Sequence, residues 1–451
     1  MVIRTKISIN WTQMAAHRNL FLRLLLLVLI AMLCSCGQKE QKSWKAGLAI
    51  AEDTISYLDV FGEWECNTLI VSHDADLQGK LCTLPKGVTL SFQGGVIKNG
   101  TLVGDGTKIE SQGVCFDKVR ILGTWDVPEI SSSMFKDLDY DNSLKDVVAL
   151  ANPDVENRIV IEKGDYQVSA LRGGDVCVPV CSNTELLLNG TIRMTPNDFE
   201  GCDIVRAWGN QITMTGTGTI VGDKHTHTGN TGEWGMGIEV MDSHNVTISE
   251  LTIKDCWGDC IYVGEGSTNV LIENCLLDHG RRQGISITAA DRVTIKDCTI
   301  TNVAGTAPEY GIEVEPNGGD VVDHVMIENV TVRDSKGGFL VYGRAADARV
   351  GKVIIRNCDV SADKKITVAA DKCDTLIVQD CDITQHNTWG CISCSEVGHV
   401  EVMNNTLRYD KGVLSTLKDW ARPRFGKKRV EVIEVKDCET TVIVRNQECK
   451  L

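Results

Sequence analysis

A short motif of β-branched residues returns every 23 to 32 residues through the second half of the chain. It reads VTISEL, VLIENC, VTIKDC, VMIENV, VIIRNC, LIVQDC and VEVMNN, beginning at Val246, Val270, Val293, Val325, Val353, Leu376 and Val400. Short strands repeated at this period, with Asn, Asp and Gly between them, indicate a solenoid in which each repeat is one coil. We predict an all-β fold, a right-handed parallel β-helix with capping segments at both ends, because parallel crossovers strongly prefer the right hand.

One column of the repeat holds cysteine in four coils, at Cys275, Cys298, Cys358 and Cys381. Leu251 and Val330 take the same position in other coils, so these cysteines are expected to be buried as small hydrophobic residues. Neighbours would stack ~4.8 Å apart, which leaves both free thiols and disulfides open. The residue before this column is Asn or Asp in most coils, and these side chains tolerate left-handed turns.

The N-terminus carries the features of an export signal. Arg18 and Arg23 precede an apolar run, residues 24–32, that is too short to span a bilayer. The following Leu-Cys-Ser-Cys-Gly resembles a bacterial lipobox, and Cys36 fits the acylated position better than Cys34. We predict a lipoprotein signal peptide over 1–35, lipidation of Cys36, and a tether over 36–45; an ordinary signal peptide is the alternative. The expected location is the bacterial cell envelope, lipid-anchored at the outer membrane.

Three further segments follow the tether. Residues 46–157 are expected to form an N-terminal cap with the first strands and a helix over 143–151. Residues 158–410 are expected to form the β-helix, and 411–451 a C-terminal cap. The formal net charge of -15 argues against nucleic acid as a partner, because phosphate binding needs a basic surface. No cofactor and no metal site are predicted, since His225 and His227 lack an evident third ligand.

Each coil also contains a Gly-led strand whose outward positions are unusually rich in charged and aromatic residues. We expect these outward side chains to be exposed and to contribute little packing. Carboxylates accept hydrogen bonds from sugar hydroxyls, arginines donate to sugar oxygens, and aromatic rings stack on sugar faces. The alternative is a solvated sheet face with ladders of ion pairs. The candidate residues on or beside this face are Trp234, Glu239, Asp259, Tyr262, Arg281, Arg282, Gln283, Glu309, Tyr310, Glu313, Glu315, Tyr342 and Arg344.

The sequences GTGTI, WGMGIEV, WGDCIYV and QGISI follow one another in the order seen in a known family. Over roughly residues 164–410 the chain resembles the pectin-lyase-like superfamily of parallel β-helices, distantly the polygalacturonases and the phage tailspikes. The resemblance implies this fold and a polysaccharide substrate. Asp259 matches the second residue of the polygalacturonase Asp-Asp pair, but Gly258, Met236 and Gln283 replace the other Asp residues and the His. The downstream Arg-Ile-Lys segment has no counterpart, so the family's mechanism does not carry over.

These observations favour a surface-tethered glycoside hydrolase with Asp259 and Glu313 as its catalytic carboxyls. The two residues lie two coils apart, ~9.6 Å by strand stacking, which favours an inverting reaction with Asp259 as general acid. Two alternatives remain open from the sequence. One is a lyase or epimerase acting on uronate-containing polymers, and the other is a β-helix that binds glycans without catalysis.

Overall fold

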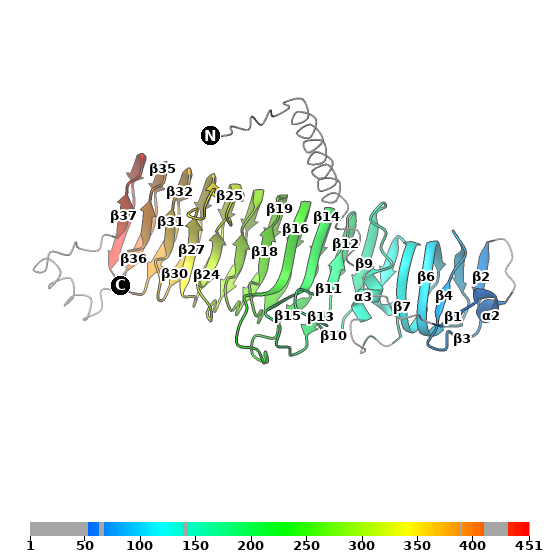
Figure 1. Ribbon diagram of the computed structural model, residues 1–451. Coiled ribbons are helices and arrows are strands. Elements are labelled where there is room, and N and C mark those ends of the chain that lie inside the picture. Colours follow the sequence, from blue (N-terminus) through cyan, green and yellow to red (C-terminus); the bar gives the residue numbers. More distant parts are fainter. Residues whose placement is uncertain are drawn as a thin grey trace, which may run out of the picture. The chain divides into compact units, whose positions relative to one another are not determined.

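Parallel strands stacked side by side make up nearly all of the chain that the computed structural model describes (Figure 1). The structure describes residues 53–62, 67–136, 138, 143–387, 390–409 and 432–450. The predicted signal peptide, Cys36 and the tether lie outside the described residues. No helix within these described ranges is long and apolar enough to cross a membrane.

The first sheet is built from the segment that precedes the regular repeats. Its parallel strands occur in the order β1-β4-β6-β5-β2, with β3 and β7 also paired to β6. The long β6 and β7 pair with each other along most of their length. The elements are β1 (Thr54–Ile55), α2 (Tyr57–Phe61), β2 (Thr68–Val71), β3 (Ala75–Asp76), β4 (Leu81–Thr83), β5 (Thr89–Phe92), β6 (Ile97–Glu110) and β7 (Phe116–Asp126).

Each coil of the β-helix passes through three faces, here named front, middle and back. The front and middle faces belong to one sheet because β14 (Gly201–Thr215) and β16 (Trp234–Ser249) run through both. The other front strands are β11 (Val176–Val180), β18 (Ile261–Gly264), β21 (Ile285–Ile287), β24 (Tyr310–Val314), β27 (Gly337–Tyr342), β31 (Val368–Asp371), β34 (Ile392–Ser395) and β37 (Ile433–Lys436).

The middle and back faces complete each coil. The middle strands are β8 (Glu129–Ser131), β9 (Asn157–Ile161), β12 (Thr184–Leu188), β19 (Ser267–Glu273), β22 (Ala290–Lys296), β25 (Val321–Glu328), β28 (Arg349–Val350), β29 (Lys352–Arg356), β32 (Thr375–Gln379), β35 (His399–Met403) and β38 (Thr440–Val444). The back strands are β10 (Asp165–Val168), β13 (Thr191–Met194), β15 (Thr219–Val221), β17 (Thr252–Lys254), β20 (Leu276–Asp278), β23 (Thr299–Thr301), β26 (Thr331–Arg333), β30 (Asp359–Ala362), β33 (Asp382–Gln385), β36 (Thr406–Tyr409) and β39 (Gln447–Lys450).

Both ends of the predicted β-helix contain strands in register with its coils. A 3-10 turn, η1 (Ser132–Met134), and the expected helix, found as α3 (Ser143–Val148), lie beside β8 and β9 at the N-terminal end. At the other end β37, β38 and β39 pair in parallel with β34, β35 and β36. The segment predicted as a C-terminal cap therefore contributes a further coil.

The core is made of inward columns that follow the period of the sequence. Successive front strands stack Ile238, Ile261, Ile285, Ile312 and Phe339, all at most 1% exposed. The four cysteines of the repeat column are 2–3% exposed free thiols, which confirms their prediction as buried hydrophobic residues.

The Asn/Asp column supplies the turn between middle and back strands. The backbone φ angles lie between 52° and 57°, in the left-handed region that most side chains avoid, at Asn274, Asp297, Asn329, Asn357, Asp380 and Asn404. Asn and Asp enter this region more readily than other side chains because they can hydrogen-bond locally. The predicted role of this column is confirmed.

Candidate functional site

The strand register of the front face lines up polar side chains from successive coils. Arg206 pairs with Glu239, Glu239 with Tyr262, Tyr262 with Ser286, and Ser286 with Glu313. This column therefore crosses five coils without a register shift between its members. It brings residues more than one hundred positions apart onto a single face.

The two predicted catalytic carboxyls meet at one guanidinium group. Arg282 lies in the turn before β21 and places Nη1 3.6 Å from Asp259 Oδ2 and Nη2 3.9 Å from Glu313 Oε2. Its Nε lies 3.3 Å from Glu233 Oε2. Since both terminal nitrogens belong to one planar guanidinium, the Asp259 and Glu313 oxygens lie within ~10 Å of each other.

Glu313 is held by hydrogen bonds on one of its two carboxyl oxygens. Gln283 Nε2 donates to Oε2 over 2.7 Å and Ser286 Oγ donates to the same oxygen over 3.5 Å. Gln283 is itself fixed, because its Oε1 accepts from the backbone N–H of Tyr310 at 2.7 Å. Glu313 Oε1 has no hydrogen-bond partner among the described residues. Gln283 thus positions the carboxyl group at the place where the resembled family has a histidine.

Both carboxyls are buried, although their positions on outward-facing strands predict exposure. Asp259 is 0% and Glu313 1% exposed, so the expectation of little packing is wrong for these two residues. Burial raises the pKa of Asp259 to about 6, with Arg282 acting in the opposite direction. Burial and the neighbouring Glu315 carboxylate raise the pKa of Glu313 to about 9. At neutral pH, Asp259 is therefore mostly ionised and Glu313 neutral.

Neighbouring turns pack against the Arg282 cluster, which consists of Arg282 and the side chains around it: Glu233, Asp259, Gln283, Ser286 and Glu313. Arg281 Nη1 donates to the backbone carbonyls of Gly232 at 2.8 Å and Trp257 at 3.2 Å. Its guanidinium carbon also lies 3.7 Å from the centre of the Trp257 ring. Arg281 thereby ties the turn before β16 to the turn before β18. The side chains of Arg282 and Glu233 are 16% and 41% exposed.

Trp257 joins the site although it was not among the predicted residues. The His227 ring stacks on it with centroids 3.7 Å apart and planes 17° apart. His227 Nδ1 in turn lies 2.8 Å from Asp223 Oδ2. The signal was present in the sequence as the Trp of WGDC, but its spacing did not distinguish a site residue from a packing residue.

The two histidines of the His-Thr-His segment have different partners. His225 contacts Asp255, with Nε2 3.0 Å from Oδ1, whereas His227 turns toward Trp257 and Asp223. Across the described ranges, no three His, Cys, Asp or Glu side chains gather in a way that could hold a metal ion.

Glu239 belongs to a second buried charge cluster upstream on the same face. Its Oε2 lies 2.5 Å from Arg206 Nε, and Arg206 also forms an ion pair with Asp203. Asp203 is 2% and Glu239 8% exposed. Burial, together with the adjacent Glu239 charge, raises the pKa of Asp203 well above its usual value.

Of the other predicted residues, three lie along the outer columns of the face. Tyr262 accepts a hydrogen bond of 2.7 Å from Thr288 Oγ1 through its hydroxyl oxygen. Trp234 is 56% exposed at the start of β16. Tyr342, on the coil after Glu315, pairs in register with Asp371.

Three further predicted residues form ion pairs or ring contacts with side chains outside the Arg282 cluster. Glu309 pairs with Lys336 and, at 3.7 Å, with Lys365, and accepts from Gly305 N at 2.8 Å. Tyr310 is 7% exposed, with Lys365 Nζ 5.6 Å from its ring centre. Arg344 pairs with Asp371 and, at 2.8 Å, with Glu396. Glu309 and Arg344 are therefore not brought to the two carboxyls, whereas Tyr310 lies beside Glu313, and burial together with the Glu313 charge raises the pKa of Tyr310.

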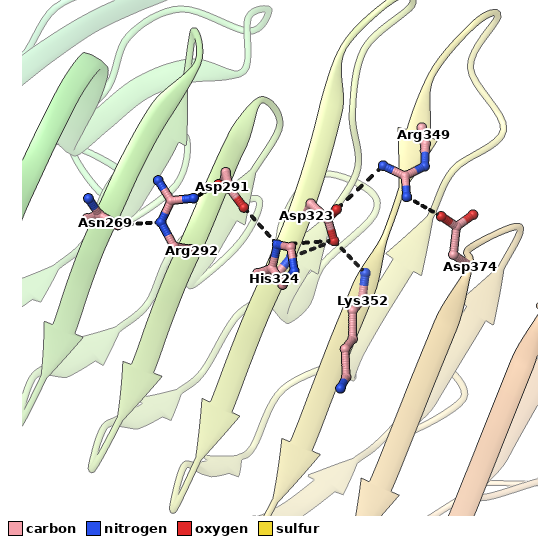
Figure 2. A network of polar contacts seen from close by, with 8 residues as sticks. All are labelled: Asn269, Asp291, Arg292, Asp323, His324, Arg349, Lys352 and Asp374. Atoms are coloured by element: carbon pink, nitrogen blue, oxygen red, sulfur yellow. Dashed lines mark hydrogen bonds and ion pairs between the residues drawn. The ribbon is translucent and has the colours of Figure 1, made fainter.

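A separate ladder of charges crosses the first residues of the middle strands, from β19 to the residue before β32 (Figure 2). Arg292 Nε donates to Asn269 at 2.6 Å, His324 contacts Asp291 at 2.9 Å, and Arg349 pairs with Asp323 at 3.5 Å. A cavity of about 480 Å³ opens near its end, lined by Arg349, Asp374 and His399 among others. Its lining includes neither Asp259 nor Glu313. The side chains of the ladder are largely exposed, and such pairs contribute little stability each.

Comparisons with known proteins agree with this architecture. The family described as "Right handed beta helix region" matches residues 172–322 and 284–447. An uncharacterized protein of Bacillus subtilis (strain 168), YclG, is 31% identical over 202 residues, which cover 38% of this chain and 34% of that protein. The chain thus matches about a third of that relative's length.

Two solved structures are similar at low sequence identity. The A-module of the Azotobacter vinelandii mannuronan C-5 epimerase AlgE6 is 11% identical, with a TM-score of 0.47 over 69% of this chain and 96% of that one. An exopolygalacturonase from Thermotoga maritima is 14% identical, with a TM-score of 0.45 over 72% of this chain and 90% of that one.

Proposed function

Because the chain belongs to the family of right-handed β-helix proteins, we propose that it acts on a polysaccharide and hydrolyses a glycosidic bond at the Arg282 cluster. The proposal rests on one feature of the structure. Two buried carboxyls from different coils converge on one guanidinium, and their surroundings push their pKa values apart, to about 6 for Asp259 and about 9 for Glu313. Such a split assigns one group as acid and the other as base.

In the proposed reaction Glu313 is the general acid. Its Oε2 already accepts from Gln283 and Ser286, so the proton of the neutral carboxyl belongs on Oε1, which has no hydrogen-bond partner among the described residues. From there it passes to the glycosidic oxygen as the bond to the anomeric carbon breaks. The sequence favoured Asp259 as the acid. The neighbouring Glu315 charge, which adds to the effect of burial and raises the pKa of Glu313 to about 9, favours Glu313 instead.

Asp259 then serves as the general base. Its carboxylate takes a proton from a water molecule, whose hydroxyl attaches to the anomeric carbon. Carboxyls ~6.5–9.5 Å apart leave room for that water and give inversion, a range compatible with two groups that share Arg282. Arg282 keeps Asp259 more acidic than burial alone would. We propose that substrate reaches the pair when the Glu233–Arg282 contact opens, because Glu233 is the most exposed of the three acids that contact Arg282.

The test is incubation of the mature chain with a panel of polysaccharides, followed by reducing ends and ultraviolet absorbance together. Hydrolysis produces reducing ends without absorbance, whereas elimination produces both. Glu313→Gln and Asp259→Asn are each expected to lower kcat by ~10²–10⁴-fold. Glu309→Gln is the matched control, because Glu309 is also a buried acid of this face but pairs with Lys336 and Lys365. Equal rates in all four proteins would refute the proposal.

A specific observation favours a second candidate, a β-helix that binds glycans without catalysis. Both carboxyls are at most 1% exposed in this structure. In the same assay that function gives binding with neither reducing ends nor absorbance. For either function we propose that lipidation at Cys36 tethers the chain to the cell envelope, where polymeric glycans are met.

A further inference from the structure

We propose, building on the hydrolase site proposed above, that the front face between β14 and β24 selects an uncharged glycan, whose hydroxyls bind the site, over a uronate polymer. Recognition of a uronate would need an arginine or lysine available to its carboxylate. The arginines of this stretch of the face are already engaged by the protein.

Arg206 and Arg281 are both occupied. Arg206 forms ion pairs with Asp203 and Glu239, and both of those carboxyls are buried. Arg281 donates to the backbone carbonyls of Gly232 and Trp257 and lies against the Trp257 ring. A ligand carboxylate could reach either guanidinium only by displacing partners that the fold holds in place.

Arg282 is surrounded by carboxyl groups on every nitrogen. Glu233, Asp259 and Glu313 contact Nε, Nη1 and Nη2 at 3.3, 3.6 and 3.9 Å. Glu315 adds a further negative charge beside Glu313. A uronate at this position would place its carboxylate among like charges in a buried region, which is unfavourable.

Most of the buried polar atoms left without a hydrogen bond suit hydroxyl groups. Arg206 Nε and Arg282 Nε also lack one within the described residues, but each lies beside a carboxylate, that of Glu239 and that of Glu233. Neither carboxyl oxygen of Asp259 has a well-aligned hydrogen bond within the described residues, although the side chain is fully buried and Ser286 and the Gln283 N–H lie close enough to lower its pKa. Trp257 Nε1 is likewise buried and unpaired among these residues. A sugar hydroxyl donates to a carboxylate oxygen and accepts from an indole N–H, so one functional group satisfies both.

Two exposed tryptophans add apolar surface beside these groups. Trp234, at the start of β16, is 56% exposed, and Trp208, in register with Met241 of β16, is 44% exposed. They stand at the two ends of the front strands whose centre holds Arg206 and Glu239. Rings in this arrangement stack on sugar faces and need no charge on the ligand.

The test uses matched polymers that differ only in charge. Polygalacturonate, polymannuronate and polyglucuronate are each compared with the same polymer after chemical reduction of its carboxylates to primary alcohols. Affinities are measured by calorimetry on full-length Glu313→Gln, in which turnover is slow. We expect at least one reduced polymer to bind ~10-fold more tightly than its parent. Tighter binding of any parent uronate, or binding of no reduced polymer, would overturn the inference.

A second variant tests the cause. Asp203→Asn combined with Glu239→Gln leaves Arg206 without its carboxylate partners and should raise affinity for the uronate polymers while sparing Asp259 and Glu313. An unchanged uronate affinity would show that pairing of Arg206 does not set selectivity. Catalysis is judged separately, from hydrolysis of the bound reduced polymer by the wild-type chain. Binding without hydrolysis refutes the proposed function and leaves the selectivity intact.

Discussion

Replacing Asp259 with Asn should make the protein more stable at neutral pH while removing the proposed base. Asp259 is 0% exposed, and neither of its oxygens has a well-aligned hydrogen bond within the described residues. Burial raises the pKa of its carboxyl from 3.8 to about 6 in the folded chain. The ionised form is therefore less favourable in the folded state than in the unfolded state, and a neutral amide of the same shape avoids that cost.

The size of the expected stabilisation follows from the difference between the pKa values of Asp259 in the folded and unfolded states. One pKa unit corresponds to 1.36 kcal/mol, so a rise of about two units corresponds to ~3 kcal/mol. Because the folded pKa lies above the unfolded value, the protonated carboxyl contributes this stability fully below about pH 3.8. The contribution is lost as the pH rises through about 6. Asp259→Asn should thus exceed wild type by up to ~3 kcal/mol at pH 8 and by less than ~1 kcal/mol at pH 4.

The assay is equilibrium urea unfolding at pH 4 and pH 8, followed by tryptophan fluorescence. Glu309→Gln is the control of opposite sign. Burial favours a higher pKa for Glu309, but Lys336, Gly305 N and Lys365 together lower it. Its ionised form therefore stabilises the fold above the unfolded pKa, and that stability is lost as the pH falls. Glu309→Gln should destabilise the protein at pH 8 and much less at pH 4.

Two outcomes would refute this reasoning. If Asp259→Asn were less stable than wild type at pH 8, the carboxylate would be stabilised by Arg282 more than it is penalised by burial. If its advantage were the same at both pH values, the effect would come from packing and not from ionisation.

The kcat/KM of hydrolysis should rise as Asp259 ionises near pH 6 and fall as Glu313 loses its proton near pH 9, and a pH profile without both limbs would contradict the assigned roles. Asn329→Ala should lower stability by ~1 kcal/mol in thermal unfolding, because φ is 52° there, whereas Asn329→Gly should cost less; equal losses would exclude a backbone cause. Cys36→Ala should move the protein from the membrane fraction to the soluble fraction while Cys34→Ala stays bound, and the reverse result would show that the lipobox register is wrong.

The fold could be predicted because every coil repeats the same pattern of inward hydrophobic residues and Asn or Asp turns. Inward columns such as Ile261 and Ile285 recur at a fixed place in each repeat, and Asn274 and Asp297 mark the same turn. An error in assigning one coil would not have changed the prediction of a parallel β-helix. Local sequence and global structure agree in this part of the chain.

The site could be predicted only in part, since its geometry depends on turns that do not repeat. The strand pattern placed Glu313 on the front face, but it gave no sign that Gln283, Ser286 and Arg282 would surround its carboxyl group. Glu309 and Arg344 were predicted from residue type and from their place on or beside the front strands. The structure pairs them with Lys336 and Asp371 instead, partners that lie a coil away and that no spacing rule identified.

Because the strands stack in parallel and in register, gain or loss of a coil changes the distance between the proposed acid and base by one full strand spacing. Asp259 precedes β18 and Glu313 lies on β24, with the coil of β21 between them. Duplicating that middle coil would preserve every strand pairing yet move the two carboxyls ~4.8 Å further apart. Deleting it would bring them closer by the same step. Gain or loss of one repeat, an ordinary event in the history of solenoid genes, could thus abolish or remake the chemistry of such a protein while its fold persists.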